Sequence, residues 1–291
     1  MRQTWPAPAK LNLFLHVTGR RPDGYHTLDT LFQFLDYGDE LSFEITDVPR
    51  IGRALPLADV PEDRDLTIRA ARALQTQAGV ERGVVVHLTK RLPQGGGLGG
   101  GSSDAATTLL ALNHLWGCGL GLDELAVLGL SLGADVPVFV RGQAARAVGV
   151  GEVLEPANPP ESAYVVLMPP VQVSTASVFA AWDREFQLTP PGAAGRIRGF
   201  RATPDGNDLE PIVRRLYPPV DDALRWLAKF CPARMTGSGA RVFVPVASME
   251  EGREILAARP EGLADGFVTR SVNRHPLHVR LFGQNWGVAK R

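Results

Sequence analysis

The most informative stretch of the sequence is residues 92–104, which read Leu92-Pro93-Gln94-Gly95-Gly96-Gly97-Leu98-Gly99-Gly100-Gly101-Ser102-Ser103-Asp104. It lies between an expected strand at residues 84–92 and an expected apolar helix at residues 102–116. Glycine lets backbone N–H groups approach an anion without a Cβ clash, and a helix N-terminus adds unpaired donors and partial positive charge. A flexible linker does not usually lead directly into an apolar helix with serine at its cap. The stretch therefore predicts a phosphate-binding loop.

Three known kinds of phosphate loop fit this stretch poorly. The pattern Gly95-x-Gly97-x-x-Gly100 satisfies a dinucleotide motif through glycine density alone, and the paired serines argue against that reading. A Walker A loop needs Gly-Lys-Ser/Thr, whereas Gly101 runs directly into Ser102, so a lysine must come from elsewhere, with Lys90 and Lys10 as candidates. The chain also has no HRD or DFG sequence of the protein kinases.

Length and composition indicate a globular protein of ordinary character. The 291 residues correspond to about two domains, and 44% of them are hydrophobic and 21% charged. The formal net charge of zero gives no overall field that would recruit nucleic acid or an anionic membrane. Two isolated cysteines, Cys118 and Cys231, favour a reducing, cytoplasmic setting, and no membrane span or signal peptide is expected.

Hydrophobic periodicity predicts an α+β chain in two parts. Alternation over residues 11–17 predicts a strand that places Lys10 and Asn12 on one face, followed by extended structure at 31–45. Further predictions are helices at 65–77 and 123–132 and extended structure at 136–150, then strands at 164–168, 241–246 and 267–272 and helices near 177, at 221–230 and from 248. Three prolines within residues 155–162 place a domain boundary there, giving domains 1–155 and 156–291, and residues 188–207 are expected to form an exposed loop.

Asp135 is the candidate for orienting or deprotonating an attacking hydroxyl group. It stands among apolar residues at 132–139, where Gly133 and Pro137 are expected to fix a corner between a helix and a strand. An aspartate in such surroundings costs free energy without a partner, and Lys10 could supply the opposite charge. The alternative is a turn aspartate bonded to its own backbone, which the residues alone leave open. The Gly-Ser-Gly corner at 237–239 is, by itself, a plain turn.

Three segments, residues 8–13, 93–107 and 236–240, resemble the three motifs of the GHMP small-molecule kinases in order and spacing. Residues 24–26, 31–33, 133–139 and 207–209 further resemble the branch that phosphorylates the 2-hydroxyl of a diphosphocytidyl-linked methylerythritol in the non-mevalonate isoprenoid route. The resemblance covers nearly the whole chain, apart from residues 188–205 and the tail after Phe282. It implies an N-terminal sheet-and-helix nucleotide-binding domain, a C-terminal ferredoxin-like α/β sandwich, and an active site in the cleft between them.

The resemblance also implies roles for individual residues, with ATP and Mg²⁺ as cofactors. Asp135 would be the general base and Lys10 would orient it. His26 would read the cytosine edge, while Tyr25 and Phe179 would stack on the ring. The remaining substrate contacts would be Asn12, Thr175, Gly237 and Ser238. The expected ATP-binding residues are Lys90, Pro93, Gln94, Gly95, Gly96, Gly97, Leu98, Gly99, Gly100, Gly101, Ser102, Ser103, Asp65 and Asp104.

Asp65 and Asp104 depart from the family pattern. Asparagine is common in the family at the first position and occurs at the second. An ionised aspartate cannot donate from its side chain, so adenine contacts at these two positions would differ from the family's.

Other functions remain to be distinguished. Another GHMP kinase would act on homoserine, mevalonate or a sugar, and the Tyr25, His26 and Phe179 set argues against it because those acceptors carry no pyrimidine. A catalytically silent nucleotide-binding module would not need both Lys10 and Asp135. A dinucleotide-dependent oxidoreductase is the remaining alternative. No side chain is predicted to ligate a metal, His275 and His278 are expected in a surface turn, and a monomer or a homodimer is equally compatible with the sequence.

Overall fold

The computed structural model describes residues 3–57, 60–93, 95–186 and 205–282. Its longest feature is an antiparallel hairpin of β1 (Trp5–Arg20) and β2 (His26–Thr46), whose register runs from Trp5 opposite Leu41 to Arg20 opposite His26. The strand predicted from the alternation at residues 11–17 is confirmed, but both of its faces are buried at Lys10, Leu11 and Asn12. Lys10 and Asn12, the two candidate site residues of the N-terminal segment, therefore lie on a strand of this hairpin.

The remaining strands extend this hairpin into one mixed sheet. They are β3 (Ile51–Arg53), β4 (Gly83–Thr89), β5 (Ala145–Gly149), β6 (Val153–Pro156), β7 (Ala163–Met168), β8 (Arg234–Met235), β9 (Val242–Val246) and β10 (Asp265–Val272). The strand order is β3-β4-β2-β10-β7-β9-β8, with β1 and β5 also paired to β2 and β6 paired to β5. Of these pairings only that of β3 with β4 is parallel.

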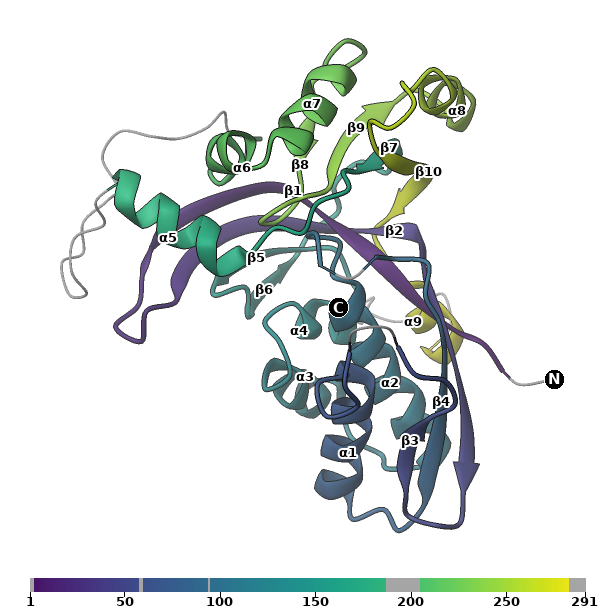
Figure 1. Cartoon of the computed structure of the whole chain (residues 1–291). Helices are drawn as coiled ribbons and strands as arrows, with labels where there is room; N and C mark the ends of the chain where they lie inside the picture. Colours follow the sequence, from purple (N-terminus) through teal and green to yellow (C-terminus); the bar gives the residue numbers. More distant parts are fainter. Residues whose placement is uncertain (1–2, 58–59, 94, 187–204, 283–291) are drawn as a thin grey trace, which may run out of the picture.

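The helices form two groups on either side of the hairpin (Figure 1). The first group is α1 (Leu66–Ala78), α2 (Gly100–Trp116), α3 (Leu122–Leu130) and α4 (Val136–Arg141). The second group is α5 (Thr175–Phe186), α6 (Glu210–Leu216), α7 (Pro218–Leu227) and α8 (Met249–Ala257). Each group covers a hydrophobic core of its own. The predicted α+β class is confirmed.

The end of the described chain returns to the first core. Helix α9 (Pro276–Phe282) inserts the fully buried Leu277 there, and β10 pairs with β2 through Ser271 and Val272. The division into domains 1–155 and 156–291 stays a prediction.

The extended structure predicted for residues 136–150 is wrong in its first part. Residues 136–141 form α4, and only β5 is extended. Pro137 lies in the first turn of α4, where its missing N–H costs no hydrogen bond and its fixed φ suits the helix. Burial of Val138, Phe139 and Val140 overrides the strand preference of these residue types. Asp135 therefore lies at the N-terminal end of a helix and not at the start of a strand.

The serine cap expected for the helix after the glycine stretch is also wrong. Helix α2 begins at Gly100, and its N-cap is Gly99 with φ 72°, so Ser102 and Ser103 lie within the first turn. A side chain at Gly99 would be strained at that φ, which explains why glycine and not serine occupies the cap.

The surface turn predicted for His275 and His278 is wrong, because both residues are buried. The His278 ring packs against Gly142, and the backbone N–H of His275 donates to the Gly142 carbonyl at 2.9 Å. Burial lowers the pKa of both rings, that of His278 to about 4. They are neutral packing groups of the first core.

Some predictions fall on residues that the structure does not describe. They concern Gln94, most of the loop expected at residues 188–207, and the tail after Phe282. Within the described ranges, no helix combines the length and the apolar character that crossing a membrane requires.

Candidate active site

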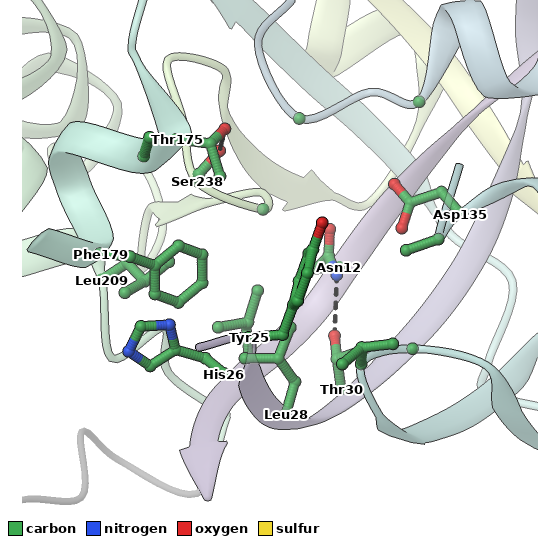
Figure 2. A pocket seen from close by; sticks show the side chains of 18 of the residues that line it. Asn12, Tyr25, His26, Leu28, Thr30, Asp135, Thr175, Phe179, Leu209 and Ser238 are labelled. Carbon is green, nitrogen blue, oxygen red and sulfur yellow. Dashed lines mark hydrogen bonds between the residues drawn. The ribbon is translucent and has the colours of Figure 1, made fainter. Parts of the chain in front are cut away.

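A cavity of about 960 Å³ opens between the hairpin, the glycine stretch and α5. Its wall includes most of the residues that the sequence singled out. They are Lys10, Asn12, Tyr25, His26, Gly95, Gly96, Gly97, Gly99, Gly100, Gly101, Ser102, Asp135, Thr175, Phe179, Gly237 and Ser238. Figure 2 shows Phe179 and His26 at one end of this cavity and Asp135 at the other. Segments more than 200 residues apart in the chain therefore meet around one space.

Lys10 contacts two polar side chains, Asn12 and Asp135, at the Asp135 end of the cavity. Its ammonium Nζ is 3.3 Å from Asp135 Oδ2 and donates to Asn12 Oδ1 at 2.6 Å. The Lys10 side chain is buried, while that of Asp135 remains 34% exposed. Asp135 has no capping hydrogen bond to α4, so its carboxylate is available to a molecule in the cavity. The predicted pairing of Lys10 with Asp135 is confirmed.

A hydrogen-bonded network fixes Asn12, the residue that accepts from Lys10. Asn12 Nδ2 donates to Thr30 Oγ1 at 2.8 Å (Figure 2), and the backbone N–H of Asn12 donates to Thr236 Oγ1 at 2.9 Å. Thr236 also bonds the Gly97 carbonyl at 3.2 Å. This network ties the first strand to both glycine-rich segments, so the amide oxygen that accepts from Lys10 is held in one orientation.

The glycine stretch needs its glycines at specific points. A Cβ on Gly97 would lie 2.3 Å from the Thr236 carbonyl oxygen, and a Cβ on Gly99 would lie 2.9 Å from the Phe139 ring and 3.1 Å from Lys10 Cγ. Both residues have positive φ, 82° and 72°. The backbone thus packs close to Lys10, and the N-terminus of the 17-residue α2 faces the cavity through Gly100, Gly101 and Ser102.

The opposite end of the cavity is aromatic. The His26 and Phe179 rings stack with centroids 4.4 Å apart and planes 15° from parallel, and His26 Nε2 lies 2.6 Å from Asp183 Oδ1. Tyr25 is 68% exposed on the turn between β1 and β2. The hydroxyl groups of Thr175 and Ser238, both in the cavity wall, form a hydrogen bond of 2.7 Å. This end offers flat apolar surface together with a fixed imidazole.

Lys90 and Asp104 do not line this cavity. The Lys90 ammonium bonds Asp39 Oδ2 and, at 2.9 Å, Asp104 Oδ2. Burial raises the pKa of Asp104 to about 8, since it outweighs the opposing effect of the Lys90 charge, and the nearby charge of Asp39 adds to the rise. Burial alone would lower the pKa of Lys90, but Asp104 and Asp39 together raise it. Lys90 is thus already paired with Asp39 and hydrogen-bonded to Asp104.

Four further predicted residues also lie outside the cavity wall. Asp65 caps α1 through Thr67 N–H at 2.8 Å and pairs with Arg53 at 3.1 Å, so both carboxylate oxygens are engaged within the protein. Leu98 and Ser103 are buried, and Pro93 lines a separate cavity. Within the described ranges, no group of three or more His, Cys, Asp or Glu side chains is placed to hold a metal ion.

The sequence reasoning missed Thr30, Thr236 and Asp183. Asp183 follows Phe179 by four residues on α5, a spacing that places both on one helix face, so it could have been found once Phe179 was chosen. Thr236 begins the segment quoted for the third motif. Thr30 has no local signal, because its role arises from the pairing of β1 with β2.

Comparison with known proteins gives the family. The model of the GHMP kinases N terminal domain matches residues 65–143, and that of the GHMP kinases C terminal matches residues 192–265. With the cavity described above, these matches define the chain as a GHMP kinase, a class of small-molecule kinases that use ATP.

Two relatives of high identity and one crystal structure show to which family of GHMP kinases the chain belongs. The chain is 53% identical to a 4-diphosphocytidyl-2-C-methyl-D-erythritol kinase of Marinobacter nauticus, over 96% of this chain and 98% of the relative. It is 54% identical to the kinase of the same name from Thiobacillus denitrificans, with the same shares covered. A crystal structure of 4-(cytidine 5'-diphospho)-2C-methyl-D-erythritol kinase superposes with a TM-score of 0.78 at 34% identity, covering 92% of this chain and 99% of that one. The chain belongs to the 4-diphosphocytidyl-2-C-methyl-D-erythritol kinase family.

Proposed function

We propose that this protein transfers the γ-phosphoryl group of ATP to the 2-hydroxyl of 4-diphosphocytidyl-2-C-methyl-D-erythritol. The observation that carries the proposal is the position of Asp135. Its accessible carboxylate lies 3.3 Å from Lys10, in a cavity that also contains the glycine stretch and the His26–Phe179 pair. A kinase for this substrate needs an anion-binding loop, a base and a pyrimidine site within reach of one another.

The glycine stretch and the N-terminus of α2 would hold the triphosphate. Glycine backbone and unpaired helix N–H groups suit phosphate oxygens. Mg²⁺ takes oxygen ligands, mostly from substrate phosphates and water with one or two from the protein, and the Ser102 hydroxyl in the cavity wall fits such a ligand set. When bound, Mg²⁺ neutralises charge on the phosphates.

Asp135 and Lys10 would carry the chemical step. Asp135 accepts the proton of the 2-hydroxyl while that oxygen bonds to the γ-phosphorus, and the bond from the γ-phosphorus to the bridging oxygen breaks to release ADP. Lys10 fixes the Asp135 carboxylate and places positive charge next to the transferring group. Asn12 and Thr30 keep the Lys10 ammonium in position.

His26 would recognise the amino edge of cytosine. With Asp183 accepting from Nε2–H at 2.6 Å, a neutral ring presents Nδ1 as an acceptor, which matches the donor amino group of cytosine. Phe179, whose ring stacks on His26, and the exposed Tyr25 would supply the aromatic surfaces that contact the base. The setting proposed for this reaction is the cytoplasm, in keeping with the free thiols of Cys118 and Cys231.

The test is coupled ADP release from purified protein with the diphosphocytidyl substrate, homoserine and mevalonate as separate acceptors. We expect turnover with the first and background rates with the other two. Equal turnover with homoserine or mevalonate would refute the proposed acceptor.

The Asp135→Asn variant tests the proposed base. Asparagine keeps the shape of the side chain but cannot take the proton, so turnover should fall about 10²-fold or more while ATP binding stays nearly unchanged. Isothermal titration with ATP provides the control, and unchanged turnover would remove Asp135 from the mechanism.

A further inference from the structure

Arg241 is a buried cation for which the described residues provide no partner. It follows the turn at residues 236–240 and directly precedes β9. The residue is 6% exposed, its Nε has no hydrogen-bond partner, and in the described parts of the chain no carboxylate forms an ion pair with it. An unpaired buried charge is costly, and proteins normally match it with a counter-charge.

The guanidinium of Arg241 lies directly against the glycine stretch. A Cβ on Gly96 would fall 2.7 Å from Cζ of Arg241 and 2.9 Å from both Nε and Nη1. Gly96 lines the active-site cavity, whereas Arg241 lines a different cavity behind it. The backbone of Gly96 therefore separates the guanidinium from the proposed triphosphate site.

The two lysines proposed from the sequence as substitutes for the Walker lysine are already engaged. Lys10 bonds Asn12 and Asp135, and Lys90 bonds Asp39 and Asp104. Each lysine thus already faces at least one acidic side chain before a nucleotide arrives. Arg241 is the cation at the glycine stretch whose charge the described residues leave unmatched.

We propose that Arg241 is a positioning residue for the nucleotide, which supplies positive charge from behind Gly96 and thereby helps the glycine stretch to hold a polyphosphate. This inference rests on the proposed function, since it takes the glycine stretch to be the triphosphate site. Burial lowers the pKa of Arg241, yet an arginine stays charged at neutral pH, so the attraction to phosphate remains. Little solvent screens it, because the guanidinium is buried.

The experiment measures the affinity of wild type, Arg241→Gln and Arg241→Lys for ATP, ADP, AMP and adenosine by isothermal titration without acceptor. A charge effect scales with the charge of the ligand. We expect Arg241→Gln to weaken ATP about tenfold or more, ADP and AMP progressively less, and adenosine hardly at all. Arg241→Lys should bind ATP within about threefold of wild type. In a separate kinetic assay at saturating ATP, the KM of Arg241→Gln for the acceptor should be unchanged.

Arg259→Gln is the control, since Arg259 lines the same rear cavity with a buried unpartnered Nε, but its Nη2 lies 4.0 Å from Asp265 Oδ1 and the three atoms nearest to a Cβ on Gly96 all belong to Arg241. It should bind all four ligands as wild type does. Equal weakening of ATP and adenosine by Arg241→Gln, unchanged ATP binding, or a folding defect that Arg241→Lys shares would overturn the proposal. Because no acceptor is present, a protein that binds ATP but fails to phosphorylate the cytidine substrate would refute the proposed function and leave this inference standing.

Discussion

At the scale of single residues, His26 links the aromatic end of the cavity to α5. Its ring is stacked on Phe179 and its Nε2 bonds Asp183. His26→Ala should therefore raise the KM for the cytidine substrate about tenfold or more and leave the KM for ATP unchanged, because the proposed hydrogen bond to the base is lost together with the ring that packs against Phe179. Steady-state kinetics with each substrate varied in turn provide the measurement. Equal effects on both KM values would argue against a cytosine contact.

For single residues of the site, the sequence predicts some side-chain contacts and not others. An aspartate among apolar residues needs a partner, which predicts the pairing of Asp135 with Lys10, and the structure places the two charged groups 3.3 Å apart. Lys90 was expected at the phosphates, but Asp39, which no motif singled out, bonds its ammonium. That contact depends on the packing of β2 against β4, and sequence spacing carries no information on it.

At the scale of elements, helix α2 offers a direct comparison between its two ends. Gly99 at the N-cap and Gly117 at the C-cap have almost the same φ, 72° and 70°. A Cβ on Gly99 would strike Phe139 and Lys10, whereas a Cβ on Gly117 would meet no atom within 4 Å. Alanine at either position costs about 1–2 kcal/mol for the left-handed backbone, and only Gly99→Ala should also displace Lys10.

We therefore expect Gly99→Ala to reduce turnover at least tenfold and Gly117→Ala to leave turnover near that of wild type. Thermal melting of both variants separates the common backbone cost from the effect on the site. A Gly117→Ala enzyme as impaired as Gly99→Ala would mean that helix stability, and not the packing of the N-cap on Lys10, limits activity.

Element types were predicted well where periodicity was long and poorly where it was short. The alternation in β1 and the helical spacing in α2 each extend over many residues, and both elements were found. The six residues of α4 read as a strand because valine and phenylalanine favour extended structure locally. Tertiary burial decided otherwise, and Pro137 in the first turn was the one signal that pointed to a helix.

At the scale of the whole molecule, the two halves are joined by more than the segment around residue 156. The Asn273 carbonyl accepts from Ala144 N–H at 2.8 Å, and Arg280 of α9 lies over the Trp5 ring with its Cζ 5.2 Å from the centroid. The last described elements therefore close back onto the first. Proline clustering indicates where a chain changes direction, but it does not show that a later segment returns to an earlier core.

Leu277 tests whether this return couples the stability of the two halves. It is fully buried in the first core although it belongs to the second half of the chain, and three residues separate α9 from β10, which pairs with both β2 and β7. Leu277→Ala should lower the free energy of unfolding by about 2–5 kcal/mol, through lost burial and the cavity left behind. Val279→Ala on the same helix is the matched control, and because Val279 is 37% exposed, a much smaller loss is expected.

Denaturant unfolding should be followed by the fluorescence of Trp116 in the first half and Trp226 in the second, each in a variant whose other tryptophans are replaced by phenylalanine. If α9 couples the halves, Leu277→Ala shifts both transitions together, whereas a shift confined to Trp116 would show that the two cores unfold independently.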